Sequence, residues 1–305
     1  MSKIFVHAKT MIDGVSDTPK FDQLITCEGG KITAIEPYHT INEDVVEANV
    51  VTPGFFNCHV HIMEPVGFGT DKEFTFIEKT FYTQKHLEDY INSGVTFIRV
   101  VGTENDYDMD IRDCVDAGLV KGPHMLCAGR CICMTGGHGW QGGIEADGVD
   151  ECRKVARTLL KKGVDLIKVM ATGGVMTKGV EAGIADYMVK KAIYVKDAHV
   201  ESFKKAYAQG VKIALGTDGG TPFNYHNNTA YEFELMEKYG VDRMDILKIA
   251  THNSADCLGV LDDYGTLEVG KNADLVCLKE NPLDAISNVR KIDKVIKDGA
   301  VVVKK

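Results

Sequence analysis

The segment VVTPGFFNCHVH at residues 50–61 determines how this chain folds. Its first part, up to Phe56, is an apolar run of the kind that forms a buried strand. Side chains alternate between the two faces of a strand, so His59 and His61 are expected to point to the same side. Two imidazoles at the end of a buried strand are well placed to share one metal ion. The alternative is that one histidine is a hydrogen-bonded core residue and the other is solvated. Such ordinary roles are typical of lone histidines and less typical of a pair on one face of a strand.

The composition is that of an ordinary globular protein. The 305 residues are 44% hydrophobic and 26% charged, enough to bury a substantial core in one or two domains. The formal charge of −9 argues against a nucleic-acid or anionic-membrane partner, because both need basic patches. No apolar run reaches the length of a membrane span, and the N-terminus does not resemble a signal peptide. We therefore expect a soluble protein without a nucleic-acid or membrane partner.

The nine cysteines are an odd number and are scattered along the chain, partly inside apolar runs. A disulfide framework favours an even count in a short secreted chain, so reduced thiols and a cytoplasmic location are predicted. Cys131 and Cys133 form a C-x-C pair. No second pair of Cys or His residues lies nearby, so they are interpreted as strand residues and not as ligands.

Both ends of the chain have a β pattern of short apolar runs between turn residues. The runs lie at residues 3–8, 23–27, 31–35, 273–278, 292–297 and 300–304. The last two flank Asp298-Gly299 and are typical of a hairpin. We predict that residues 1–52 and 259–305 form one composite β-sandwich domain, which leaves residues 53–258 as an independent unit.

The middle of the chain alternates strand and helix patterns. After the strand that carries His59, further strands are predicted at residues 95–101, 123–131, 165–170 and 211–215. Helices are predicted at about residues 108–117, at 149–162 before Gly163, and at 186–209. This alternation indicates a parallel sheet, either open or closed into a barrel. In a closed barrel, the chemistry gathers at the C-terminal ends of the strands.

Three more strand-end residues are candidates for this chemistry. His138 lies in a glycine-rich loop, Lys168 lies within an apolar run, and Asp218 lies on a glycine-flanked turn. Each has an ordinary alternative: a loop histidine, a lysine that reaches the rim of the sheet, and a turn or capping aspartate. A buried ammonium is costly unless it is paired or chemically changed. Together with the histidine pair, these residues indicate a site for a divalent metal.

Several motifs resemble those of the metal-dependent amidohydrolase superfamily. They are PGFFNCHVH at 53–61, Lys168, MATGGV at 170–175, GTD at 216–218, ATHNSA at 250–255 and GTLEVGKNADL at 265–275. The set is most similar to the branch of Xaa-Pro dipeptidases (prolidases) and imidazolonepropionase-like enzymes, and it spans nearly the whole chain.

This resemblance implies a (β/α)8 TIM-type barrel with a composite β-domain, and commonly a two-zinc centre. It places His59, His61 and Asp218 around one zinc ion, and it makes Lys168, carboxylated by CO₂, the bridge to a second. A metal-bound hydroxide would attack the substrate carbonyl, with Asp218 as the catalytic residue that moves the proton. His138 resembles a substrate-binding residue of this branch.

The implied function is zinc-dependent hydrolysis of amide or peptide bonds, most like that of an Xaa-Pro dipeptidase. The substrate would be a dipeptide or another small molecule, and the protein would be a homo-oligomer. Two alternatives stay open. One is a catalytically impaired relative that acts as a binding protein, and the other is an imidazolonepropionase- or deaminase-like hydrolase of cyclic amides.

One part of the family pattern is absent from this sequence. Only 46 residues separate the starts of the predicted strands at 165 and 211, whereas four βα units of about 30 residues each take roughly 120. Strands five to seven, with two further histidine ligands, are missing as a group, and the break falls near residues 181–186. The one histidine in this interval, His199, has helical surroundings and is not predicted to be a ligand. Either the natural protein has an internal segment that this sequence omits, which the intact site motifs favour, or the chain is a damaged homologue.

Overall fold

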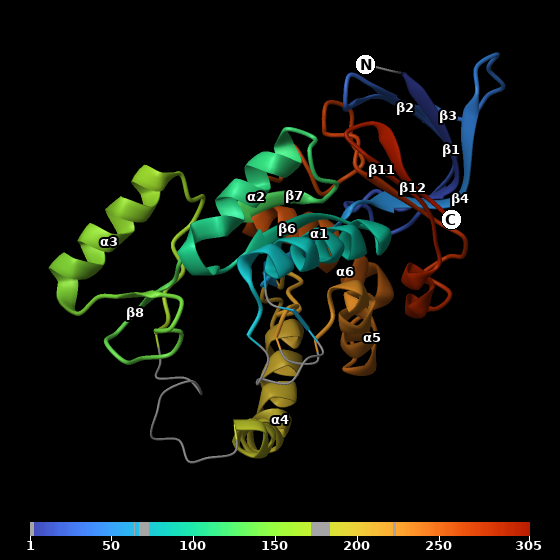
Figure 1. The fold of residues 1–305 in the computed structure, drawn as a ribbon. Helices are drawn as coiled ribbons and strands as arrows, with labels where there is room; N and C mark the ends of the chain where they lie inside the picture. The colour runs from blue at the N-terminus through green and yellow to red at the C-terminus, as the bar shows by residue number, and fades with distance from the viewer. Residues whose placement is uncertain (1–2, 64, 67–72, 172–183, 222–223) are drawn as a thin grey trace.

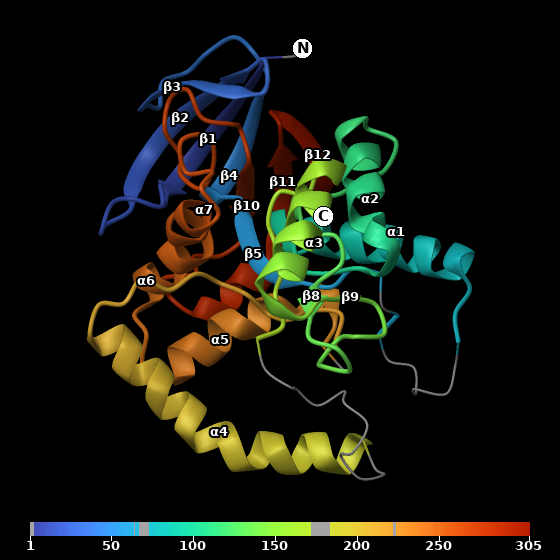
Figure 2. The same cartoon turned by 90° about the vertical axis from the view of Figure 1, so that its left-hand side faces the viewer.

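The structure is a computed structural model that describes residues 3–63, 65–66, 73–171, 184–221 and 224–305. Figure 1 shows a β-rich end built from both termini and a helical region that contains α4 at the far end of the molecule. The view in Figure 2 agrees: α4 again lies at the end of the molecule opposite the sheet that the termini form.

Seven strands from the two ends of the chain form one hydrogen-bonded sheet in the order β12-β11-β10-β4-β1-β2-β3. Their bounds are Ile4–Met11 for β1, Lys20–Glu28 for β2, Lys31–Pro37 for β3, Val45–Pro53 for β4, Leu275–Leu278 for β10, Ile292–Lys297 for β11 and Ala300–Lys304 for β12. Antiparallel pairing of β10 with β4 joins the C-terminal strands to the N-terminal ones. The two ends of the chain therefore pair in one sheet, as predicted. A sandwich of two sheets is not observed among the described residues, because these seven strands are continuous in one sheet. The domain boundaries remain predictions.

The apolar run at residues 50–56 is divided between two sheets. It ends β4 at Pro53, and β5 (Phe55–Val60) starts a second, parallel sheet with β6 (Val95–Val100) and β7 (His124–Cys127). Gly54 forms the joint. A Cβ on this residue would lie 2.0 Å from the Thr96 hydroxyl oxygen, so only glycine fits between the two sheets.

The second sheet does not close into a barrel among the described residues, so the (β/α)8 barrel stays a prediction. Residues 165–170 and 211–215 are predicted strands. The first segment makes one bridge, between Ile132 and Val169, and the second makes one backbone hydrogen bond to β5, from the Cys58 amide to the Leu215 carbonyl. The predicted strand at 123–131 is shortened to β7. A strand is assigned only where consecutive residues pair with a neighbouring strand, and the segments at 165–170 and 211–215 make too few such pairs among the described residues.

The predicted helices are confirmed within two residues at their ends. They are α2 (Tyr107–Asp116), α3 (Gly148–Lys162) and α4 (Ile184–Ala208). Gly163 ends α3 in the left-handed conformation at φ +97°, the usual C-terminal cap. The remaining elements are α1 (Phe76–Asn92), η1 (Glu104–Asp106), β8 (Ile132–Cys133), β9 (Ile144–Glu145), η2 (His226–Asn228), α5 (Ala230–Lys238), α6 (Arg243–Lys248), η3 (Ile249–Asn253), α7 (Ser254–Cys257) and η4 (Ile286–Arg290).

Helix α1 positions the second sheet. Thr75 and Glu78 form a reciprocal capping box at its start, and Leu87, Tyr90 and Ile91 are fully buried in the core that also contains β5 and β6. None of the described helices combines the length and apolar character that a membrane crossing needs.

All nine cysteines are free thiols. Cys133 lies in β8 as predicted, and Cys131 directly precedes that strand. Both are buried, and neither belongs to a group of potential metal ligands among the described residues.

Candidate metal centre

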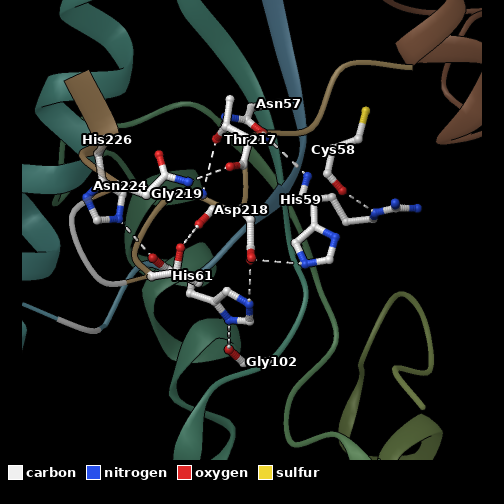
Figure 3. Close-up of polar contacts among 12 residues, drawn as sticks. Asn57, Cys58, His59, His61, Gly102, Thr217, Asp218, Gly219, Asn224 and His226 are labelled. Carbon is white, nitrogen blue, oxygen red and sulfur yellow. Dashed lines mark hydrogen bonds and ion pairs between the residues drawn. The ribbon is translucent and has the colours of Figure 1, made fainter. Parts of the chain in front are cut away.

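Three of the predicted site residues meet at the C-terminal end of β5 (Figure 3). His59 lies within β5, and His61 follows the last residue of that strand. The Nε2 atoms of both histidines lie 3.4 Å from Oδ1 of Asp218, and the three possible ligand atoms all lie within 4.8 Å of one another. Their side chains are between one quarter and just over one half exposed, so a small molecule can reach them.

The segment that carries Asp218 runs along the free edge of β5. The Asp218 amide donates to the His59 carbonyl at 2.9 Å, and the His61 amide donates to the Gly219 carbonyl at 2.7 Å. Two backbone bonds therefore fix the carboxylate between the two imidazoles. These two bonds do not require residues 211–215 to form a complete strand. The three site residues therefore come together even though this segment does not form a ladder with β5.

Asn57, which sequence analysis did not assign to the site, ties the same two segments together. This fully buried residue donates from Nδ2 to the Thr217 hydroxyl at 2.7 Å, and its Oδ1 accepts from the Thr217 amide at 3.1 Å. The Thr217 hydroxyl also accepts from the Gly219 amide. Asp218, between these anchored neighbours, has φ +57°, a left-handed conformation that costs a non-glycine residue free energy. The anchors hold that conformation.

The hydrogen bond of His61 to Gly102 fixes which ring nitrogen faces the site. Nδ1 lies 3.2 Å from the Gly102 carbonyl oxygen, which can only accept, so Nδ1 carries the proton. In the neutral imidazole, the form that binds a metal, the lone pair of Nε2 is then left on the side of Asp218; without a metal, a protonated Nε2 can donate to that carboxylate. Metal-ligating histidines usually have such an arrangement, with the second nitrogen donating to a carbonyl or carboxylate.

The Asp218 carboxyl is anionic at neutral pH. Burial alone would raise its pKa, but the bonds and charges of His59 and His61 outweigh burial and hold the pKa well below its usual range. An ionised carboxylate is the form that binds a cation and accepts a proton.

These three residues fit a zinc ion. A tetrahedral zinc with bonds of about 2.0–2.1 Å holds its ligand atoms about 3.3 Å apart. The two Nε2–Oδ1 separations of 3.4 Å match that spacing without any rearrangement. Two imidazoles and one carboxylate also form a donor set that zinc accepts.

The other two predicted site residues, Lys168 and His138, make no hydrogen bond or ion pair with the group of His59, His61 and Asp218. Lys168 is half-buried, its carbonyl accepts from the Ile132 amide, and its ammonium makes no hydrogen bond or ion pair with a residue that the structure describes. His138 is half-buried in the loop between β8 and β9, and its Nδ1 is buried without a partner among the described residues. Their roles as bridge and substrate contact remain predictions. His199 is exposed on α4, as expected of a residue that is not a ligand.

A second group of potential ligands lies at the opposite end of the parallel sheet. His124 begins β7, and its Nε2 lies 3.3 Å from Oδ2 of Asp274 and 3.4 Å from Oδ1 of Asp298. Burial alone would lower the pKa of His124, but the two carboxylates outweigh it and raise the pKa to about 9. The imidazole is therefore protonated at neutral pH and has no free lone pair, so this group is a partly buried ion-pair cluster between the two sheets, in which Asp274 is buried and Asp298 is exposed.

Gly220 is the tightest point of the candidate metal centre. It has φ +100°, and a Cβ there would lie 1.9 Å from the His61 carbonyl oxygen. We expect Gly220→Ala to lower the free energy of unfolding by more than about 3 kcal/mol, as measured by urea titration. The added methyl group would force the backbone of residue 220 away from the backbone of His61.

Gly240→Ala is the matched control for Gly220→Ala. Gly240 has a similar φ of +95°, but no atom lies within 4 Å of the position that a Cβ would take. Only the conformational cost of about 1–2 kcal/mol therefore applies. Equal losses in the two variants would show that the close approach at His61 is unimportant.

The sequence matches the model of the amidohydrolase family over residues 50–183 and 177–302. The chain belongs to the amidohydrolase family. The two matched stretches overlap at residues 177–183, next to the break that the sequence pattern places near residues 181–186. Members of this family typically bind metal, and the three residues at the end of β5 offer this amidohydrolase a site for one.

Curated relatives of this amidohydrolase are hydrolases and deaminases. It is 23% identical over 387 residues to an ochratoxinase of Aspergillus niger, covering 87% of this chain and 77% of the relative. Since 87% of 305 residues is about 265, about 120 of the 387 aligned positions have no residue in this chain. It is also 27% identical over 173 residues to an imidazolonepropionase of Thermoanaerobacter pseudethanolicus, covering 53% of this chain and 36% of the relative.

Solved structures show the same fold. An Xaa-Pro dipeptidase with bound methionine has a TM-score of 0.85 at 24% identity, covering 98% of this amidohydrolase and 99% of the dipeptidase chain. A prolidase complexed with N-methylphosphonate-L-proline has a TM-score of 0.82 at 20% identity, covering all of both chains. The resemblance to the prolidase and imidazolonepropionase branch is thus confirmed at the level of family and fold.

Proposed function

We propose that this amidohydrolase is a zinc-dependent hydrolase of amide bonds in dipeptides and related small molecules, with a preference for an Xaa-Pro bond. The observation that carries the proposal is the convergence of His59, His61 and Asp218 at the end of β5. The prolidase-like solved structures, two of which hold methionine or a proline phosphonate, support the substrate class.

In this proposal, His59, His61 and Asp218 hold the metal. When bound, zinc polarises the substrate carbonyl and lowers the pKa of water. The hydrogen bond from His61 to Gly102 presents Nε2 to the metal, and the Asn57–Thr217 contacts hold Asp218 in place. Oδ1 of Asp218 lies between the histidines, and Oδ2 is left to take a proton and return it to the leaving amine.

Lys168 and His138 have supporting roles in the proposal, Lys168 as a further metal ligand and His138 as a substrate contact. Lys168, once carboxylated, would become an anionic ligand: its amine, after loss of a proton, would add to CO₂ and release a second proton, and its Nζ has no partner among the described residues that would oppose this reaction. The buried Nδ1 of His138, which has no partner in the described part of the chain, is a donor or acceptor that a substrate could satisfy. Neither residue is needed for the three-residue centre, so one zinc ion per chain is expected.

A hydrolysis screen tests this function. The full chain, loaded with zinc, is incubated with Xaa-Pro dipeptides, other dipeptides and N-acyl amino acids, and the released amino acids are quantified by mass spectrometry. We expect turnover of at least one dipeptide that stops on chelation and returns with zinc. Turnover only of cyclic amides, or ammonia release from a nucleobase, would favour the imidazolonepropionase- or deaminase-like alternative. No turnover with bound zinc would favour the binding protein.

Zinc should also stabilise the chain. A ligand that binds only the folded state adds about 2.7 kcal/mol when its free concentration is about 100 times its Kd. We therefore expect zinc to raise the Tm of the chelator-treated protein in differential scanning calorimetry. The same addition should leave the Tm of His59→Ala almost unchanged, and an equal rise in that variant would place the zinc elsewhere.

A further inference from the structure

Two histidines outside the metal centre lie directly behind it. His86, on α1, and His226, in η2, are stacked with ring centroids 3.7 Å apart and an interplanar angle of 17°. Both are buried, with 6% and 2% of their surface exposed. Tyr90 closes the group with its ring edge-on to His226 at 5.3 Å. We call these three residues the aromatic layer.

The two imidazoles bind consecutive backbone carbonyls next to the metal centre. Nε2 of His226 lies 2.8 Å from the carbonyl oxygen of His61, and Nδ1 of His86 lies 2.8 Å from that of Ile62 (Figure 3 shows the first). A carbonyl oxygen only accepts, so each of these nitrogens carries a proton. The tautomers of both rings are therefore fixed by the backbone.

These bonds take the place of sheet pairing. His61 and Ile62 follow the end of β5, and no backbone amide of a described residue donates to either carbonyl. Carbonyls in the protein interior need a partner, and the neighbouring segment, in which Gly219 accepts from the His61 amide, offers no amide to either of these two carbonyls. The side-chain N–H groups of the aromatic layer supply it instead, and the Thr83 hydroxyl is a second donor to the Ile62 carbonyl at 3.3 Å.

Packing leaves the loop little freedom around these bonds. A Cβ on Gly220 would meet the His61 carbonyl oxygen at 1.9 Å, and a Cβ on Gly219 would meet the Tyr90 hydroxyl at 2.7 Å. Residues 219–220 are thus enclosed between the His61 backbone and the aromatic layer. Losing the His226 bond would leave the His61 carbonyl without its donor, and even a small shift of this peptide in search of another donor would turn the His61 imidazole away from Asp218.

We propose that His226 is a positioning residue for the metal centre: its Nε2–H bond to the His61 carbonyl, held by stacking on His86, fixes the backbone of His61 so that its imidazole faces Asp218. This inference rests on the proposed function, because it takes His61 to be a ligand. His226 itself is not a ligand, since its Nε2 is engaged with the carbonyl.

Zinc affinity is the measurement that tests this role. His226→Leu removes the N–H donor and keeps an apolar side chain, whereas His226→Gln can place an amide N–H near the position of Nε2. The dissociation constant for zinc is measured by competition with a chromophoric chelator, and the fold of each metal-free variant is checked by circular dichroism. Loss of such an outer contact typically costs about 10–100-fold in metal affinity. We expect about a 10-fold weaker Kd in His226→Leu and recovery of most of it in His226→Gln.

A second pair of variants covers the case in which His226→Leu does not fold. The amide of His226→Asn is too short to reach the His61 carbonyl, so it should bind zinc more weakly than His226→Gln at similar polarity. Zinc affinity equal to that of the unmodified chain in His226→Leu, or equal affinity of the Asn and Gln variants, would overturn the inference. His199→Leu, on the exposed face of α4, is the control and should bind zinc normally.

The same measurements separate this inference from the proposed function. An unmodified chain that binds no zinc contradicts both. An unmodified chain whose zinc is lost in His59→Ala, but kept at full affinity in His226→Leu, retains the metal centre and contradicts the role of His226 alone.

Discussion

Replacing His59 with alanine, or Asp218 with asparagine, is expected to lower kcat/KM for dipeptide hydrolysis by at least about 1,000-fold. Each change removes one of three groups whose donor atoms meet within 4.8 Å. The asparagine also removes the negative charge that the two histidines stabilise and that a proton transfer needs. The rate is measured from released amino acid with the zinc-loaded chain.

His199→Ala is the control for these two variants, because it removes an imidazole from an exposed position on α4. It should hydrolyse the same dipeptide at the rate of the unmodified chain. The metal-free variants should remain folded, as checked by circular dichroism, since His59 and Asp218 are partly exposed. Retained turnover in both His59→Ala and Asp218→Asn would show that the hydrolytic site lies elsewhere.

The second large effect concerns stability and pH at the His124 cluster. The folded pKa of His124 is about 9, whereas the ordinary pKa of a histidine is 6.5. A group whose pKa is higher in the folded chain than in the unfolded chain stabilises the fold. The full stabilisation is present when the pH is below the unfolded pKa, and it is lost as the pH rises through the folded pKa. The shift corresponds to about 3 kcal/mol, which should be present at pH 6 and largely absent at pH 10.

Asp298 sets the acid limit of the same cluster. Burial alone would raise its pKa, but His124 and Lys297 outweigh burial and lower it. A group whose pKa is lower in the folded chain stabilises the fold when the pH is above its unfolded pKa, here 3.8. This stabilisation is lost as the pH falls from there towards the folded pKa. The cluster therefore contributes most between about pH 4 and 6.5.

Comparison of the unmodified chain with His124→Gln isolates this contribution. Other groups titrate over the same pH range, but they titrate in both proteins and cancel in the difference. We expect the difference in unfolding free energy, from urea titration, to be largest near pH 6 and to fall towards pH 10. A difference that does not change with pH would mean that His124 is neutral in the folded chain.

The local part of the site could be predicted from sequence because two-residue alternation along β5 fixes the direction of its side chains. His59 and His61 do face one side, and Asp218 joins them. The helix ending at Gly163 was likewise predictable from its periodicity and cap. These features depend on a few neighbouring residues.

Features that depend on distant partners could not be predicted. Residues 165–170 and 211–215 have strand-like sequences, but whether they form a ladder depends on distant neighbours, and too few of their residues pair among those that the structure describes. The stacking of His86 on His226 joins α1 to a turn 140 positions later and leaves no periodic signal in the sequence. Asn57 lies only two residues before His59, yet its role becomes visible only when Thr217 lies beside it.

Metal content shows most directly whether His59, His61 and Asp218 hold a zinc ion. The chelator-treated chain is dialysed against dilute zinc, and the bound metal is counted by mass spectrometry together with that of the His59→Ala/Asp218→Asn double variant. We predict one zinc per unmodified chain and none in the double variant. No zinc in the unmodified chain, or an unchanged amount in the double variant, would contradict the assignment of these three residues as metal ligands.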